Sequence, residues 1–389
     1  MKRIFLDHNS TTPVHPEVVE AMLPYFSEKY GNPSSVHSFG RETKVALEEA
    51  REKVAKFLNG SPSEICFTGC GSESDNLAIK GIAWANQDKG KHIITSRIEH
   101  PAVIESCQWL EKQGFEVAYL PVDKYGLVNP DDLKRAIRKD TILVSIMHAN
   151  NEIGTIQPIR ELSKIAHESG VYFHTDAVQS AGKIPVDVKQ LDVDLLSLSG
   201  HKLYAPKAVG VLYIKQGTKI DTWLHGGSQE RGRRSGTENV PYVVGFGKAC
   251  EIAQRDLAML SEKMTNFSTV FWEKIKTAIP DVLLNGHPTE RIPNTLNLAF
   301  PGCDAQSLIM ALDLQGVAVA SGAACHSGAV NPSSVLTALG VPNEVALSAI
   351  RFSFGRQNTE EDVEYVGGIL AGMVERLKNA KTVTAYKKS

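Results

Sequence analysis

Short apolar runs alternate with amphipathic stretches of helix length over most of the chain. The runs of strand length include ILVSIMH at 142–148, VYFHTD at 171–176 and DLLSLSG at 194–200. Between the first two, the stretch EIGTIQPIRELSKIAHESG at 152–170 has the apolar spacing expected of a helix. This alternation predicts a largely parallel α/β sheet with helices on both of its faces.

Polar residues stand at the end of each of these three runs. They are His148 and Asn151, His174 and Asp176, and Ser199 and His201. Open parallel sheets bind their ligands beyond the carboxyl ends of the strands. We therefore expect the three strand ends to contribute to one shared site.

The pattern changes after about residue 250, where a long polar helix, AQRDLAMLSEKMTNFSTVFWEKIKTAI, precedes shorter strands around NTLNLAF. We predict a large domain at 15–255 and a smaller α+β domain formed by 1–14 and 256–389. The last helix is expected to begin at Thr359, because Asp362 three residues later resembles a capping box. Its apolar residues fall on one face, so this helix should pack against the rest of the chain.

Composition and charge narrow the possible partners. The 389 residues include 42% hydrophobic and 22% charged residues, which is typical of a globular protein. With 42 basic and 44 acidic side chains the net charge is −2, so we expect neither nucleic acid nor an anionic membrane as a partner. The N-terminus has no long apolar region, and no stretch approaches the roughly 20 apolar residues of a membrane span. We expect a soluble, cytoplasmic protein.

Six cysteines are too few in a chain of this length to indicate a disulfide framework. Cys66 and Cys70 have a spacing that some zinc sites use, but no matching pair of Cys or His follows them. We therefore expect no metal site. Most of the thiols should be buried apolar side chains.

The segment ICFTGCGSESDNLAIKG reads as a strand, a glycine-containing turn and the start of a helix. Gly69 and Gly71 allow a ligand to approach the backbone closely, and Ser72 with the free N–H groups of a helix N-terminus would form an anion cradle. An ordinary helix cap is an equal alternative. A dinucleotide site is a weaker one, because the pattern lacks its third glycine.

Lys202 and Asp176 are two further candidate residues for the same site. Lys202 directly follows a predicted strand end, where it is either a solvated surface lysine or a Schiff-base former for a carbonyl cofactor. Asp176 ends a run that should be buried, and a buried acid needs a cationic partner such as a pyridinium nitrogen. The combination of the lysine, the acid and the glycine turn indicates such a cofactor far more specifically than any one of the three.

Nine segments distributed over nearly the whole chain carry a family resemblance. They are LDHNSTTPVHP, GNPSSVHSFG, SRIEHPAV, HANNEIGTIQPI, HTDAVQS, SGHKLYAPK, RGRRSGTENV, SGAACHSG and IRFSFGR. On these segments the chain resembles the NifS/IscS group of cysteine desulfurases, class V aminotransferases within fold type I of the pyridoxal-phosphate enzymes. The resemblance implies a large domain with a mostly parallel seven-stranded sheet and a smaller α+β domain that carries a catalytic cysteine loop.

The resemblance also implies roles for single residues around pyridoxal 5'-phosphate. Lys202 would hold the cofactor covalently, and Asp176 would stabilise its protonated ring nitrogen. Gln179 would bind the ring hydroxyl, and His100 would stack on the ring and act as an acid or base. The phosphate would be bound by Gly71, Ser72, Ser199, His201 and, from the second subunit of a homodimer, Thr237.

The same resemblance implies the reaction. Asn151, which also lies in the cofactor site, and Arg351 would bind the substrate carboxylate, for which a guanidinium is well suited. The sulfur of L-cysteine would pass to Cys325 as a persulfide, leaving L-alanine, and then to a sulfur-acceptor protein. Iron–sulfur cluster assembly, tRNA thiolation and DNA sulfur modification all stay open as destinations.

Three alternative functions stay open beside this one. A selenocysteine lyase is the first, because His326 follows Cys325 where the family more often has threonine. A fold type I aminotransferase would share Lys202 and Asp176 but would have no use for a cysteine on a glycine-flanked loop. A scaffold without cofactor is disfavoured by the presence of every residue that the chemistry needs.

Overall fold

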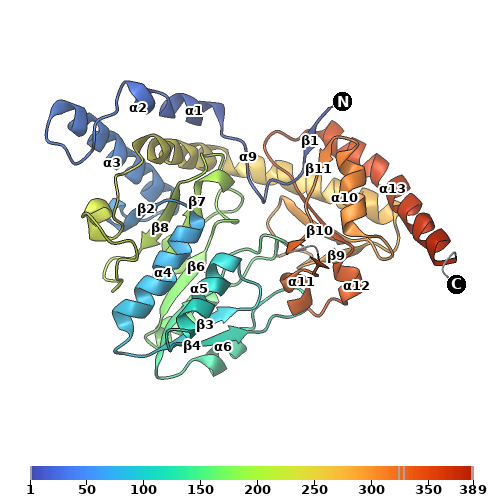
Figure 1. Ribbon diagram of the computed structural model, residues 1–389, viewed down its shortest axis with the longest axis horizontal. Helices are drawn as coiled ribbons and strands as arrows, with labels where there is room; N and C mark the ends of the chain where they lie inside the picture. The colour runs from blue at the N-terminus through green and yellow to red at the C-terminus, as the bar shows by residue number, and fades with distance from the viewer. Residues whose placement is uncertain (1, 323–324, 327–328, 387–389) are drawn as a thin grey trace.

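The computed structural model describes residues 2–322, 325–326 and 329–386, with the backbone alone for 325–326, 329–330 and 380–386. One part, on the left of Figure 1, is built on a seven-stranded sheet. Its strands, in spatial order, are β2 (Ile65–Thr68), β8 (Gly210–Ile214), β7 (Leu195–Ser199), β6 (Tyr172–Asp176), β5 (Thr141–Ser145), β3 (His92–Ser96) and β4 (Glu116–Leu120). Only β8 runs antiparallel to its neighbours, so the prediction of a mostly parallel seven-stranded sheet is confirmed.

Helices cover both faces of this sheet. One face packs against α4 (Gly71–Asn86) and α5 (Pro101–Glu111). The other packs against α3 (Ser38–Leu58), α6 (Pro130–Ala136), α7 (Ile159–Glu168) and the first half of α9 (Val240–Ala278).

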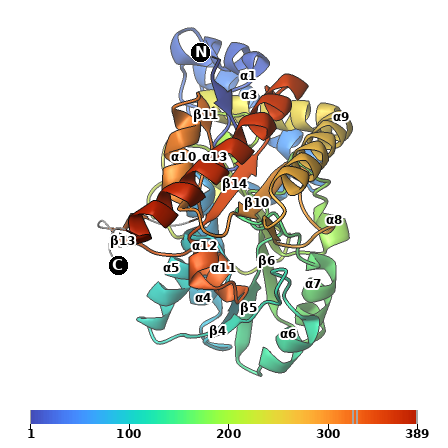
Figure 2. The ribbon, with the colours of Figure 1, turned by 90° about the vertical axis from the view of Figure 1, so that its right-hand side faces the viewer.

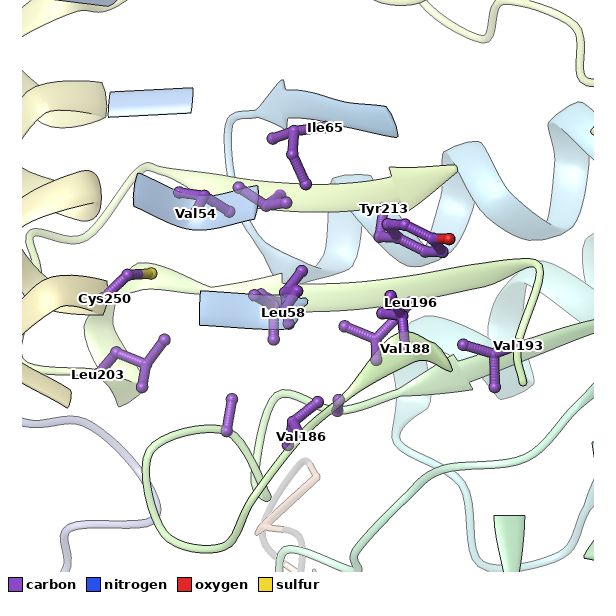
Figure 3. Packing of buried hydrophobic residues seen from close by; sticks show 14 of the residues in the cluster. Val54, Leu58, Ile65, Val186, Val188, Val193, Leu196, Leu203, Tyr213 and Cys250 are labelled. Carbon is purple, nitrogen blue, oxygen red and sulfur yellow. The ribbon is translucent and has the colours of Figure 1, made fainter. Parts of the chain in front are cut away.

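Successive residues of the strands serve the two faces alternately, as the pleat of a sheet requires. Ile65 and Phe67 of β2 join the core cluster under α3, whereas Cys66 between them joins the cluster under α4. Figure 3 shows part of the first cluster, with Val54 and Leu58 of α3 beside the strands. Burial on both faces explains why these strands are almost continuously apolar.

The parallel direction brings six strand ends to one edge of the sheet. Both β2 and β7 run antiparallel to β8, so β2 has the same direction as β7 and the other parallel strands. The carboxyl ends of β2, β3, β4, β5, β6 and β7 therefore meet at this edge. The segments that follow them carry most of the predicted site residues.

The second part, on the right of Figure 1, contains a smaller antiparallel sheet. Its strands are β14 (Ala349–Ser353), β10 (Thr295–Ala299) and β9 (Leu283–Asn285), and two strand pairs lie beside it: β1 (Ile4–Phe5) with β11 (Val317–Ala318), and β12 (Cys325–His326) with β13 (Ala329–Val330). The helices α10 (Ala305–Asp313) and α13 (Glu360–Tyr386) lie against this sheet in Figure 2.

A separate hydrophobic core holds the second part together. It joins Ile4 and Leu6 to buried residues between Met264 and Val374, while α9 passes from one part into the other. The two cores support the division at residues 14 and 255, which stays a prediction. The remaining short helices are α1 (Pro16–Met22), α2 (Pro24–Ser27), α8 (Val188–Leu191), α11 (Ser334–Ala338) and α12 (Asn343–Ala346), with 3-10 turns η1 (Pro62–Glu64), η2 (Gly200–Lys202) and η3 (Gln229–Gly232).

Two expected helix starts need correction. The helix expected over 152–170 begins only at Ile159, because the preceding residues form a turn closed by Asn150 N–H to the Thr155 carbonyl at 3.0 Å. The long helix expected from residue 253 begins already at Val240, where the Asn239 side chain caps the Tyr242 amide.

The start expected for the last helix is confirmed. Thr359 and Asp362 each accept a hydrogen bond from the other's backbone N–H, as in a capping box. Among the described residues, no helix is both long and apolar enough to cross a membrane.

Candidate active site

A cavity of about 330 Å³ lies at the edge where the strand ends meet. It is lined by residues from segments far apart in the chain. Ten of the predicted site residues line it, namely Gly71, Ser72, His100, Asn151, Asp176, Gln179, Ser199, His201, Lys202 and Arg351. The expectation that several strand ends share one site therefore agrees with the geometry.

Lys202 enters this cavity from the 3-10 turn η2 after β7. Its Nζ donates hydrogen bonds of 2.6 Å to the backbone carbonyls of Asn9 and of Ser10. Burial, assisted by the charge of Arg351, lowers the pKa of Lys202 to about 8, against a smaller opposing effect of nearby carboxylates. A pKa of about 8 leaves roughly a tenth of this lysine as the free amine at pH 7, far more than for an ordinary lysine.

Asp176 ends β6 on the cavity wall. Its Oδ1 accepts a hydrogen bond of 2.8 Å from the backbone N–H of Val178. Burial raises the pKa of Asp176, although His100, the Val178 amide and Lys202 oppose this rise. A cationic group of a ligand at this carboxylate would stabilise its charged form.

His100 is the N-cap residue of α5. Its Nδ1 accepts a hydrogen bond of 3.1 Å from the backbone N–H of Ala102, which fixes the ring and leaves the proton of the neutral imidazole on Nε2. Burial lowers the pKa of His100, so the neutral form is favoured. This ring can stack on a flat ligand and exchange a proton through Nε2.

The predicted anion cradle lies at the N-terminus of α4, which begins at Gly71. The Sγ of Cys70 accepts from the Glu73 amide at 3.4 Å, so the thiol caps the helix. A Cβ at Gly71 would lie 3.1 Å from Cβ of Ser199 and from Cγ2 of Val178, which is tighter than ordinary contact. Glycine thus keeps the helix N-terminus close to the strand ends, where its N–H groups attract an anion.

Arg351, in the middle of β14, connects the second part of the chain to the cavity. Its guanidinium donates to Oδ1 of Asp7 at 2.6 Å and to the carbonyl of Asn151 at 3.1 Å. The Arg351 side chain is almost fully buried. An arginine held in this way presents a fixed fork to a carboxylate.

These residues fit pyridoxal phosphate. The cavity combines an amine of lowered pKa, a buried carboxylate and a helix N-terminus at which a Cβ would be crowded. The amine suits the carbonyl of the cofactor, the carboxylate suits its pyridine nitrogen, and the helix N-terminus suits its phosphate. No group of three metal-ligating side chains occurs among the described residues.

One predicted residue lines a different cavity, and the side chain of another falls outside the described part of the chain. Thr237 lines a separate one, together with Gly69, Glu230 and Arg234 among others. Cys325 has its backbone in β12, paired with Val330, and its side chain lies outside the described atoms.

Sequence reasoning missed several cavity residues. Asn9, Ser10 and Asp75 line it directly, and Lys183 hydrogen-bonds to two residues at its wall. Asn9 and Ser10 belong to LDHNSTTPVHP, one of the segments that carried the resemblance, which was the available signal. Nothing in the sequence marked Lys183 or Asp75 as different from other polar residues.

Comparisons with known proteins agree with this geometry. Residues 4–366 match the family model described as aminotransferase class-V. The chain is 54% identical to a protein of Dictyoglomus turgidum named cysteine desulfurase IscS, over 100% of this chain and 98% of that protein. A solved NifS-like protein matches with a TM-score of 0.91 and 40% identity, over 97% of this chain and all of that one. A structure of SspA in complex with cysteine matches with a TM-score of 0.80 and 36% identity, over 91% and 99% of the two chains.

Proposed function

The chain belongs to the class V aminotransferase family as a pyridoxal-phosphate-dependent cysteine desulfurase, and we propose that the cavity at the strand ends is its active site. The observation that carries this proposal is the meeting of Lys202 and Asp176 in one cavity, next to the N-terminus of α4. L-cysteine is the substrate that we assign to it. The bound cysteine in the SspA relative supports this assignment.

We propose that each residue keeps the role that the resemblance implied. Lys202 holds the cofactor, Asp176 keeps a proton on the ring nitrogen, and Gln179 donates to the ring hydroxyl. His100 covers the ring, while the phosphate is bound by Gly71, Ser72, Ser199 and His201. When bound, pyridoxal phosphate withdraws electrons from the substrate Cα and so weakens the bond between carbon and sulfur.

The substrate would be oriented by its carboxylate. Arg351 and Asn151 bind this group, and the pKa of about 8 lets Lys202 act as a free amine that takes the Cα proton. The Cys325 thiolate then attacks the substrate sulfur. A sulfur–sulfur bond forms as the carbon–sulfur bond breaks, and the carbon keeps the electron pair and takes up protons, so that alanine leaves and a persulfide stays on Cys325.

We propose a homodimer in which Thr237 reaches the phosphate site of the partner subunit. Its position outside the cavity of its own chain supports this arrangement. Exposed apolar side chains on α1 to α3 support a protein partner at that face: Val19, Leu23, Phe26, Tyr30, Val36, Phe39 and Val45. We further propose a cytoplasmic enzyme that passes its sulfur to an acceptor protein, because Cys325 must stay a free thiol between turnovers.

Product analysis tests this function. Purified enzyme, pyridoxal phosphate and L-cysteine should give alanine and protein-bound persulfide in equal amounts during the first turnover. Cys325→Ser should keep the visible absorbance of the cofactor and form neither product, because a hydroxyl is a far poorer nucleophile toward sulfur than a thiolate. Cys250→Ala, which removes a buried thiol of α9, is the matched control and should keep both products.

Each alternative function has its own outcome in this assay. A keto acid in place of alanine would identify an aminotransferase. Turnover of selenocysteine alone would identify a selenocysteine lyase. Alanine release from L-cysteine by Cys325→Ser at the parent rate would refute the assignment of the nucleophile.

A further inference from the structure

A second lysine, Lys183, lies behind the wall of the cavity and has no part in the reaction described above. It follows β6 in the segment that also carries Asp176 and Gln179. Its Nζ donates hydrogen bonds to Oε1 of Gln179 at 2.7 Å and to Oδ1 of Asn9 at 3.1 Å. Both acceptors are neutral amides, and within the described part of the chain no carboxylate forms an ion pair with this lysine.

The charged groups around Lys183 oppose a second cation. Burial holds its pKa well below the usual range, and the charges of Lys202 and Arg351 lower it further. The neighbouring imidazole of His8 is buried, which lowers its pKa to about 4, so the ring is neutral and does not compensate the charge of the lysine. The burial of this amine lowers the free energy of unfolding, and its two hydrogen bonds oppose that loss.

The bond to Gln179 determines which end of that amide faces the cavity. Nζ of Lys183 donates to the side-chain carbonyl oxygen of Gln179 at 2.7 Å, and the charged form of a lysine has no acceptor to offer the opposite end of the amide. The Nε2 end therefore points the other way, where it donates to the backbone carbonyl of Asn9 at 2.9 Å. Lys202 donates to the same carbonyl at 2.6 Å, so the Gln179 amide and the catalytic amine meet at one atom.

Asn9 is itself held from several sides. Its Oδ1 accepts from Nδ2 of Asn294 at 3.1 Å, and its Nδ2 donates to Oγ1 of Thr295 at 2.8 Å and to the carbonyl of Asn151 at 3.0 Å. The acceptor that Lys183 contacts is therefore fixed by the second part of the chain. Lys183 and Asn9 together leave the Gln179 amide one orientation.

We propose that Lys183 is a positioning residue which orients the Gln179 side chain so that its N–H group, and not its oxygen, faces the ring hydroxyl of the cofactor. This inference rests on the proposed function, because the role of Gln179 belongs to it. Without Lys183 only the bond to the Asn9 carbonyl holds this orientation, and a rotated amide would present its oxygen to the ring oxygen, which would replace a hydrogen bond by a repulsion.

The pH dependence of the holoenzyme's visible absorbance reports this contact. The midpoint of that change measures the proton on the Lys202 nitrogen that holds the cofactor. A hydrogen-bond donor at the ring oxygen stabilises negative charge on that oxygen. The oxygen then attracts the proton on the Lys202 nitrogen less strongly, so loss of the donor raises the midpoint. We expect Gln179→Ala to raise it by about one pH unit, and Lys183→Met to raise it by a similar amount.

The double variant separates positioning from any independent effect of the lysine. In the Gln179→Ala background there is no amide to orient, so Lys183→Met should add no further shift. Lys80→Met is the matched control, because Lys80 is another lysine whose pKa is lowered by burial, held 4.5 and 4.2 Å from the ring centroids of Trp109 and Trp223. It should leave the midpoint unchanged.

The thermal stability of the cofactor-free protein gives a second readout that does not need a folded Lys183→Met variant. A carboxylate at position 179 would pair with Lys183, so Gln179→Glu should unfold at a higher temperature than Gln179→Ala. Equal unfolding temperatures for these two variants would contradict the contact between Lys183 and residue 179.

Three spectral outcomes are also decisive. An unchanged midpoint in Lys183→Met, with a shift in Gln179→Ala, would overturn the positioning role and leave the proposed function intact. Additive shifts in the double variant would overturn it as well. A parent protein that acquires no visible absorbance with pyridoxal phosphate would instead refute the proposed function.

Discussion

The chemistry at the scale of single residues depends on two charged side chains that oppose each other across the cavity. Arg351 is buried and Lys202 is partly buried, and the charge of Arg351 makes the positive charge of Lys202 less favourable. Arg351 forms an ion pair with Asp7. Lys202, whose pKa is lowered to about 8, is the group that gives up its proton. The arginine thus favours the free amine of Lys202 and, by our proposal, also binds the substrate carboxylate.

The rate at which the cofactor-free protein takes up pyridoxal phosphate should follow this free amine. We expect the rate to rise with pH around a midpoint near 8, because only the unprotonated Lys202 attacks a carbonyl and its pKa is lowered to about 8. Arg351→Gln should move the midpoint to higher pH, since it removes a charge that lowers this pKa. Stopped-flow absorbance between pH 6 and pH 10 measures both.

The matched control for this change is Arg356→Gln, which removes a different partly buried guanidinium that pairs with Asp256. Its midpoint should equal that of the parent. A parent midpoint near the ordinary lysine value of about 10.4 would contradict the proposed environment of Lys202.

At the scale of elements, the sequence predicted what depends on neighbours in the chain and missed what depends on distant segments. The strands around 142–148, 171–176 and 194–200 are apolar because both faces of the sheet are covered, and they were predicted closely. The turn before Ile159 was read as helix because its apolar spacing resembles one. Glu290 and Arg291, more than a hundred residues away, add backbone contacts that hold this turn in place.

The same limit applies to the site. Lys202 and Asp176 could be predicted because their residue types and spacing indicate one chemistry. The contact of Asn9 with Gln179 joins residues 170 positions apart, and that of Arg351 with Asp7 joins residues 344 apart. Such pairs become neighbours only through the packing of the whole chain.

The turn η3 is positioned by a buried ion pair. Arg51 of α3 donates two hydrogen bonds, of 2.7 and 2.8 Å, to the carboxylate of Glu230, which also accepts from the Phe67 amide of β2. Glu230 and Arg231 adopt left-handed φ angles of 48° and 58°, which side chains other than glycine rarely adopt. The ion pair therefore holds a strained turn seven residues before Thr237.

We expect Glu230→Gln to lower the free energy of unfolding by about 3 kcal/mol, because the buried Arg51 would keep only its longer ion pair, at 3.2 Å, with the partly exposed Glu48. Glu116→Gln is the control, since its carboxylate pairs with Arg138 at an exposed position and should contribute less than about 1 kcal/mol. Differential scanning calorimetry compares the two. Equal unfolding temperatures for both variants would show that the buried ion pair stabilises the fold no more than the exposed one.

At the scale of the whole molecule, one active site is assembled from several segments of one chain and, by our proposal, from a second chain. The first 14 residues and the last strand β14 both reach the cavity of the large part, through Asn9, Ser10 and Arg351. Thr237 faces a different cavity. A second copy seated on the exposed apolar side chains of α1 to α3 would cover that surface and bring a partner's Thr237 to the phosphate.

Heterodimers of two inactive variants test this arrangement. We expect Lys202→Ala and Thr237→Asp homodimers to have little activity, because the first loses the amine and the second places a negative charge beside the phosphate. In a heterodimer of the two, one composite site carries both lesions and the other carries none, so about half of the parent activity should return. Two affinity tags allow the heterodimer to be purified and assayed.

A second pairing gives the control for that experiment. Lys202 and Asp176 line the same cavity of one chain, so a heterodimer of Lys202→Ala with Asp176→Asn leaves one lesion in each site. It should recover no activity, although subunit exchange is the same as in the first pairing. Recovery in the first pairing alone requires that Thr237 act across the interface. Failure of the first pairing in proven heterodimers would mean that each subunit completes its own phosphate site.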